Sequence, residues 1–175
     1  YKEGELERKP HFQTVDHHGA YGGGGLSFAD TTDLEHQRIT AAYYAMIENM
    51  DANIGRILEY LDSSGLRDKT LVIFMSDHGE MLGDHNRWGK AVHYQPSVGV
   101  PLVVAGPGVD SGKESEALVQ MHDLTATFLD YAGLDRMPEG DSISLRPVLE
   151  GETDSHREFV ISGLNEWQMV YDGRY

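Results

Sequence analysis

The chain has 175 residues, 39% of them hydrophobic, which fits one ordinary domain with its own core. Its formal net charge of −15 argues against nucleic acid or an anionic membrane as a partner, because neutralising phosphate groups takes surplus Lys and Arg. No stretch approaches the roughly 18 to 20 apolar residues of a membrane span, and the lack of cysteine excludes disulfides and thiolate metal sites.

The first expected elements are an irregular segment and a long helix. Residues 1–31 are rich in Gly, His and charge, which predicts an irregular surface segment. The sequence TDLE at 32–35 has the form of a capping box, and apolar residues recur from there at helical spacing until Gly65. Met46 and Met50 belong to this apolar stripe, so we expect them to pack in a core.

A strand follows, and a polar cluster begins where it ends. Residues 71–75 have the sequence LVIFM, which is typical of the fully buried strands of parallel sheets. A helix followed by such a strand is half of a crossover unit, so we predict an α/β fold with a mainly parallel sheet flanked by helices. Such folds bind ligands beyond the carboxyl ends of their strands, where Asp77 and His78 would lie. This pair suits a divalent cation, although Asp-His-Gly is equally the composition of a simple turn.

The rest of the chain predicts a second short strand, a helix and an antiparallel pair at the C-terminal end. The expected elements are a strand at 101–105, a helix from an N-cap at Asp123 to Gly133, and strands at 157–162 and 168–171. The last strand is followed by Asp172-Gly173, a favoured hairpin turn, and by two further residues. A second strand of two residues is not a natural end, so we interpret the sequence as a fragment.

Four motifs around the central strand belong together. They are SDHGEMLGDH at 76–85, WGK at 88–90, VPLVV at 100–104 and GPG at 106–108. In combination they closely resemble the sulfatases of the alkaline phosphatase superfamily. The resemblance implies an alkaline phosphatase-like sulfatase fold, with residues 1–150 as the later part of the catalytic domain and residues 151–175 as the beginning of a small antiparallel C-terminal subdomain.

The resemblance also implies roles for three residues. In sulfatases, the residues matching Asp77 and His78 are ligands of a divalent cation, usually Ca²⁺, with Mg²⁺ or Mn²⁺ as alternatives. The lysine matching Lys90 contacts the sulfate group. The nucleophile of the family is a formylglycine made from Cys or Ser in a Cys/Ser-x-Pro-x-Arg motif. Nothing in this sequence matches that motif, so we expect the formylglycine outside these residues and expect the fragment alone to be inactive.

The sequence departs from the family pattern near Lys90. Ala91 stands where many sulfatases have Gly, and Gln95, Pro96 and Gly99 stand where Glu-Glu and Arg are common. The acids and the Arg are lost together, which indicates a missing local ion pair. We therefore expect altered local packing, with the metal site retained.

Three functions are consistent with these residues. The first is a metal-dependent sulfatase that cleaves sulfate monoesters, with a sulfate ester as its substrate partner. The second is a phosphonate or phosphate ester hydrolase of the same superfamily, because a metal and a lysine can hold either tetrahedral anion. The third is a non-catalytic relative. The resemblance is compatible with a periplasmic or secreted protein, while the residues fix neither the compartment nor the oligomeric state.

Overall fold

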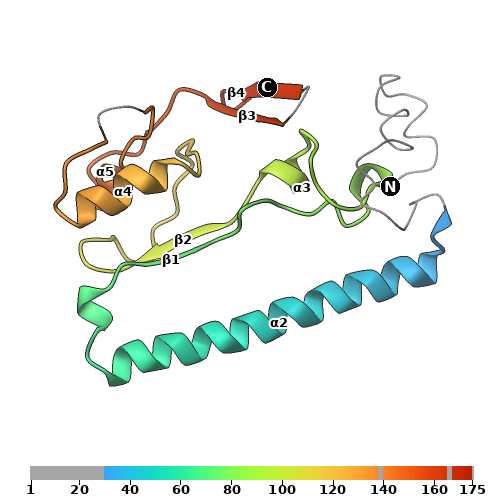
Figure 1. Cartoon of the computed structure of the whole chain (residues 1–175), viewed down its shortest axis with the longest axis horizontal. Coiled ribbons are helices and arrows are strands. Elements are labelled where there is room, and N and C mark those ends of the chain that lie inside the picture. Colours follow the sequence, from blue (N-terminus) through green and yellow to red (C-terminus); the bar gives the residue numbers. More distant parts are fainter. Residues whose placement is uncertain (1–29, 138–139, 165–166, 175) are drawn as a thin grey trace. The chain divides into compact units, whose positions relative to one another are not determined.

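The computed structural model of the chain describes residues 30–137, 140–164 and 167–174 (Figure 1). The irregular segment expected at 1–31 therefore lies almost entirely outside the described residues. The described residues group into two compact units. The first contains the residues up to Leu66 together with His78–Val100, and the second contains Arg67–Asp77 and the residues from Pro101 onward.

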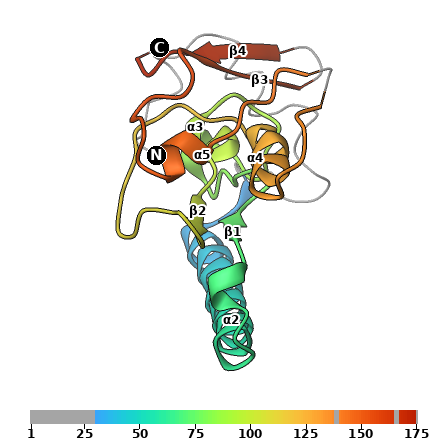
Figure 2. The same ribbon diagram turned by 90° about the vertical axis from the view of Figure 1, so that its left-hand side faces the viewer.

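The main element of the first unit is the helix α2, Asp33–Ser63 (Figure 2). It begins with the predicted capping box, because Thr32 Oγ1 accepts from Glu35 N–H at 3.4 Å and Glu35 Oε2 accepts from Thr32 N–H at 2.8 Å. The hydrogen bond from the Thr32 hydroxyl holds the pKa of the Glu35 carboxyl below its usual range. Gly65 follows the helix at φ +68°, a conformation that costs glycine little. The prediction of one long capped helix is confirmed.

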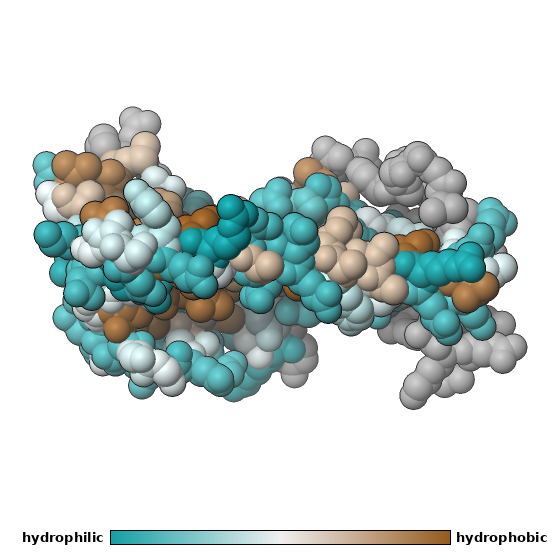
Figure 3. All heavy atoms as spheres, turned by 90° about the horizontal axis from the view of Figure 1, so that it is seen from below, coloured by the Kyte–Doolittle hydropathy of each residue, from teal (hydrophilic) through white to brown (hydrophobic). Residues whose placement is uncertain are grey.

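The apolar stripe of α2 is exposed or only half-buried in the described part of the chain. Met46 is 61% and Met50 49% exposed, and α2 contains no buried residue. The expectation that these methionines pack in a core is therefore wrong for the described part of the chain, because an amphipathic face is buried only where another element covers it. Figure 3 shows hydrophobic residues among hydrophilic ones on the surface seen from below. None of the helices in the described ranges is long and apolar enough to cross a membrane.

Short elements complete both units. The first unit also contains the 3-10 turn η4, Asp84–Asn86, and the helix α3, Gln95–Val98. The second contains η3 (Arg67–Lys69), β1 (Val72–Met75), β2 (Leu102–Ala105), α4 (Asp123–Tyr131), α5 (Arg146–Leu149), β3 (Val160–Leu164) and β4 (Trp167–Tyr171).

The strands β1 and β2 pair antiparallel, with Val72 opposite Ala105. The mainly parallel sheet that we predict is thus not seen among the described residues. The helix-strand order predicts a crossover, but a crossover pairs β1 with a strand that precedes α2, and the residues before 30 lie outside the described part. The expectation of a fully buried strand is also wrong for these residues, since the cross-strand neighbours Phe74 and Val103 are 38% and 60% exposed.

The predicted C-terminal antiparallel pair is confirmed. β3 and β4 pair with each other, with Ile161 opposite Val170. β3 begins three residues later than predicted, at Val160, while Arg157 forms an isolated bridge with Leu118.

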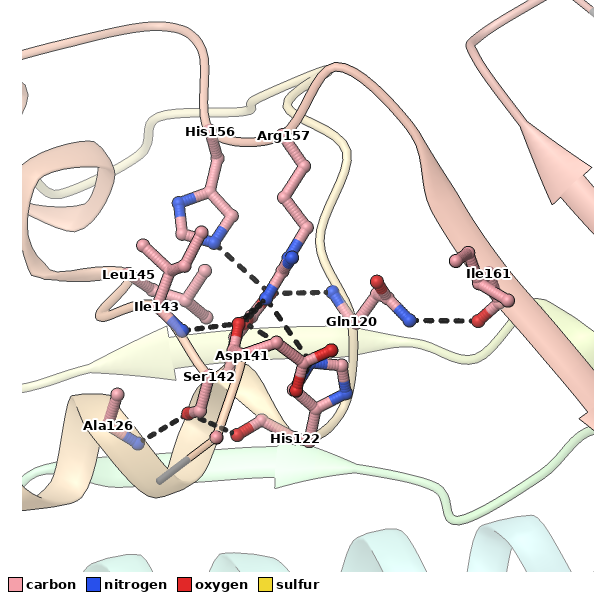
Figure 4. A network of polar contacts seen from close by, with 12 residues as sticks. Gln120, His122, Ala126, Asp141, Ser142, Ile143, Leu145, His156, Arg157 and Ile161 are labelled. Atoms are coloured by element: carbon pink, nitrogen blue, oxygen red, sulfur yellow. Dashed lines mark hydrogen bonds and ion pairs between the residues drawn. The ribbon is translucent and has the colours of Figure 1, made fainter. Parts of the chain in front are cut away.

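Asp123 is the centre of a polar network in the second unit. α4 does begin at Asp123, but its N-cap is His122 without a side-chain capping bond, so the N-cap prediction is wrong. The fully buried carboxylate instead accepts hydrogen bonds from Gln120 N, Ile143 N, His156 Nε2 and the Arg157 guanidinium. Figure 4 shows the side chains of His156 and Arg157 reaching from the C-terminal segment toward the stretch that contains Gln120 and Ile143.

The network keeps the carboxylate ionised. Burial by itself would raise the pKa of Asp123, but the hydrogen bonds, led by that from Arg157, outweigh burial and hold the pKa well below its usual range. Asp123 in turn raises the pKa of Arg157 by hydrogen bonding to it. This ion pair holds the start of α4 against the segment that leads into β3.

Candidate functional site

The predicted site residues follow β1 directly. Only Ser76 separates the exposed Asp77 from the strand. Asp77 belongs to the second compact unit, whereas His78 opens the segment of the first unit that also contains Lys90. The structure therefore places Asp77 after the strand as expected, and it brings together His78 and Lys90 within one unit.

The contact between His78 and Lys90 joins two residues at opposite ends of a loop. The Lys90 ammonium lies within hydrogen-bonding contact of His78 Nε2. On the other side of the ring, Nδ1 lies 2.8 Å from Gly79 O, and since a carbonyl can only accept, Nδ1 carries the proton. Nε2 then carries a lone pair. In this tautomer Nε2 can accept a hydrogen bond from an ammonium or bind a metal ion.

Gly79 fixes the backbone beside His78. Its N–H donates to Ser97 O at 2.9 Å. A Cβ on residue 79 would lie 1.8 Å from Pro96 O, so only glycine allows the chain to approach α3 this closely. The departure from the family pattern at Pro96 falls on this contact, which is made through the backbone.

The loop from His78 to Lys90 is closed by its own hydrogen bonds. Met81 N–H donates to Gly89 O at 2.8 Å, and Gly83 N–H donates to Arg87 O at 2.8 Å. Met81 is 1% exposed and anchors the loop by burial. The Glu80 carboxylate accepts from Gly89 N–H at 2.6 Å. Sequence reasoning missed Glu80, although it stands within the matching motif, because its partner is distant in sequence.

Two aromatic contacts join the loop to residues outside it. Trp88 lies against His36 of α2, with ring centroids 5.0 Å apart. His85 stacks on Tyr94, the N-cap of α3, with centroids 4.1 Å apart and planes at 15°. These contacts give the loop two further attachments within the first unit.

Ala91 has a left-handed backbone. Its φ is +74°, a region in which a Cβ collides with the following carbonyl and in which glycine is favoured. The residue that follows Lys90 is commonly Gly in the sulfatases that the sequence resembles. The departure at this position therefore introduces local backbone strain directly after Lys90.

The chemistry of Asp77 and His78 fits a divalent cation. A carboxylate oxygen and an imidazole nitrogen are both ligand types for such ions. Across the described ranges, no group of three or more His, Cys, Asp or Glu is arranged to hold a metal ion. The lone pair of His78 cannot serve Lys90 and a metal ion at once, so the two would compete for it.

Comparison with known proteins places the chain in a family. The family model described as Sulfatase matches residues 7–134. Arylsulfatase K of Mus musculus is 37% identical over 128 residues, which cover 73% of this chain and 23% of that protein. The choline-sulfatase of Rhizobium meliloti is 35% identical over 125 residues, which cover 70% of this chain and 24% of that protein.

A solved structure has a fold similar to that of most of this chain. The phosphonate monoester hydrolase SpPMH from Silicibacter pomeroyi matches with a TM-score of 0.79 and 34% identity, over 93% of this chain and 33% of that one. The fold is therefore that of sulfatases and their alkaline phosphatase-like relatives. The chain spans about a quarter of the length of the two curated relatives. Because the family model covers most of its residues, the chain belongs to the sulfatase family.

Proposed function

We propose that this chain contributes part of the active site of a metal-dependent sulfatase that hydrolyses sulfate monoesters. The nucleophile would be a formylglycine outside these 175 residues. Asp77 and His78 would be ligands of a divalent cation, with Ca²⁺ as first choice, and Lys90 would hold the sulfate group. Residues 1–150 would be the later part of the catalytic domain, in which β1 joins a mainly parallel sheet, and residues 151–175 would begin the C-terminal subdomain.

The observation that carries this proposal is the contact between Lys90 and His78. It supports a single site for both residues, because a metal ligand and an anion-binding ammonium act together only when they lie side by side. The contact also supports a function for the loop, since Gly79 and the hydrogen bonds of residues 81–89 hold both ends. A surface lysine without a role would need no such framework.

The roles that we propose for the cation and for Lys90 follow from the charge of the substrate. A sulfate ester is anionic and the chain has a formal net charge of −15, so attraction of the substrate requires a local positive charge. When bound, a divalent cation supplies Lewis-acid stabilisation of developing negative charge. Lys90 would exchange the His78 nitrogen for a sulfuryl oxygen and hold it through the transition state. A compact ammonium with three donors suits this task.

One observation favours a second candidate function. The structural match to a phosphonate monoester hydrolase covers 93% of this chain, and an ammonium beside a metal ligand can hold a phosphonate as well as a sulfate. Hydrolysis of phosphonate monoesters is therefore the alternative.

Steady-state kinetics on the protein expressed from the complete gene would distinguish the two. We expect a higher kcat/KM for an aryl sulfate than for the aryl phosphonate monoester with the same leaving group. A preference for the phosphonate would reverse the assignment, and the absence of turnover on both, in a protein that carries formylglycine and metal, would refute it.

A further inference from the structure

We infer that Glu80 is a positioning residue that holds Lys90 at the candidate site. This inference rests on the proposed function, in which Lys90 contacts the sulfate group. Glu80 lies two residues after His78 and has no role in the proposed chemistry. Its side chain is partly buried and points back across the loop, where it meets the backbone on the Lys90 side.

The geometry centres on Gly89, the residue before Lys90. One oxygen of Glu80, Oε1, accepts from Gly89 N–H at 2.6 Å and from Leu82 N–H at 3.4 Å. The carbonyl of Gly89 accepts from Met81 N–H at 2.8 Å. Both polar groups of Gly89 are thus held by the start of the loop, one by the Glu80 side chain and one by the backbone beside it.

This arrangement matters because Gly89 has a left-handed backbone. Its φ is +80°, and a glycine there has wide conformational freedom unless its polar groups are held. Rotation at residue 89 would swing Lys90 away from His78. The short hydrogen bond to a carboxylate is a strong constraint, since charge-assisted bonds are roughly twice as strong as neutral ones. Glu80 therefore acts on Lys90 through the backbone of Gly89.

The test is a double-mutant cycle on aryl sulfate turnover by the protein expressed from the complete gene. Glu80→Ala should lower kcat about 10- to 100-fold, because small displacements of a catalytic group are costly. In a Lys90→Ala background the same substitution should change kcat less than about twofold, since Glu80 acts only through Lys90. An equal loss in both backgrounds would show a general structural effect and overturn the inference.

Two further variants sharpen the cycle. Glu80→Gln keeps an acceptor oxygen at the same place and should retain kcat to within about fivefold; a loss as large as that of Glu80→Ala would overturn the role of the hydrogen bond. Glu35→Ala is the matched control, because Glu35 also accepts a backbone N–H bond in the first unit but at the start of α2. It should lower stability and leave kcat unchanged.

A readout independent of activity separates this inference from the proposed function. Hydrogen–deuterium exchange of peptides spanning residues 81–90 should be faster by about tenfold or more in Glu80→Ala than in the wild type. If exchange accelerates but no protein hydrolyses sulfate, the proposed function fails and the positioning of residue 90 by Glu80 stands. Unchanged exchange would overturn the positioning role whatever the activity.

Discussion

Substitution of Gly79 by Ala tests the backbone framework beside His78. A Cβ at this position would lie 1.8 Å from Pro96 O and 2.8 Å from the Pro96 carbonyl carbon. Both atoms belong to the backbone and cannot rotate away. Non-bonded contacts prefer roughly 3.5 Å or more, so the two segments must separate by ~1.7 Å. That movement takes the Gly79 N–Ser97 O bond of 2.9 Å beyond hydrogen-bonding range.

The expected cost follows from these two effects. Loss of one backbone hydrogen bond costs ~1 kcal/mol, and overpacking costs ~1–3 kcal/mol. We therefore expect Gly79→Ala to lower the free energy of unfolding by ~2–4 kcal/mol. Gly79 does not have a positive φ, so the loss would come from the collision and not from backbone conformation.

Urea unfolding followed by tryptophan fluorescence measures this loss, with Gly55→Ala as the control. Leaving aside its own helix, a Cβ on Gly55 would meet no atom of the described chain within 4 Å, and alanine favours the interior of α2. The free energy of unfolding of the Gly55→Ala control should rise by ~0.5–1 kcal/mol. If Gly79→Ala stays within ~0.5 kcal/mol of the wild type, the close approach of residue 79 to α3 is not a feature of the folded protein.

Three further predictions concern the backbone at Ala91, the Asp123 network and the binding of Ca²⁺. Ala91→Gly should raise the free energy of unfolding by ~1 kcal/mol because it relieves the left-handed φ of +74°. The control Ala52→Gly, in the interior of α2, should lower the free energy of unfolding by ~0.5–1 kcal/mol. Equal effects of the two substitutions would refute the strain at residue 91. Asp123→Asn should cost ~3–5 kcal/mol near neutral pH because Arg157 loses its buried partner. Since the folded-state pKa of Asp123 lies below the unfolded value, the difference in free energy of unfolding between wild type and Asp123→Asn is fully present above pH ~5 and should shrink as the pH falls below ~4. Urea unfolding at several pH values measures this difference. A difference that stays constant down to acid pH would count against the network. Calorimetric titration of the chain with Ca²⁺ should show weak binding or none, because Asp77 and His78 fill only a minority of the roughly 6 to 8 coordination positions that Ca²⁺ prefers. Submicromolar affinity for Ca²⁺ that is abolished by Asp77→Ala would contradict this prediction.

Local signals in the sequence predicted the structure well where the interacting residues are neighbours. The capping box joins Thr32 and Glu35 three positions apart, and both bonds are present. The strand that ends before Asp77 could likewise be placed from consecutive apolar residues.

Long-range contacts could not be predicted in this way. Sequence reasoning made Asp123 a helix cap, because His-Asp before an apolar helix has that form, whereas its partners Ile143, His156 and Arg157 lie far along the chain. The role of Glu80 depends on the return of Gly89 to the start of the loop. The pairing of β1 depends on strands whose order the helix-strand pattern does not specify. In each case the signal lies in tertiary contact and not in spacing.

The role of Lys90 in turnover is the central claim, and steady-state kinetics of Lys90→Ala on an aryl sulfate tests it most directly. In the protein expressed from the complete gene, we expect kcat to fall about 10²- to 10³-fold, as loss of one preorganised donor commonly causes. The melting temperature should hardly change, because Lys90 is exposed and such substitutions usually stay within ~0.5 kcal/mol. Lys90→Arg should rescue poorly, since a planar guanidinium does not replace a point charge. A near-normal kcat in Lys90→Ala, or a loss of rate matched by unfolding, would contradict the account.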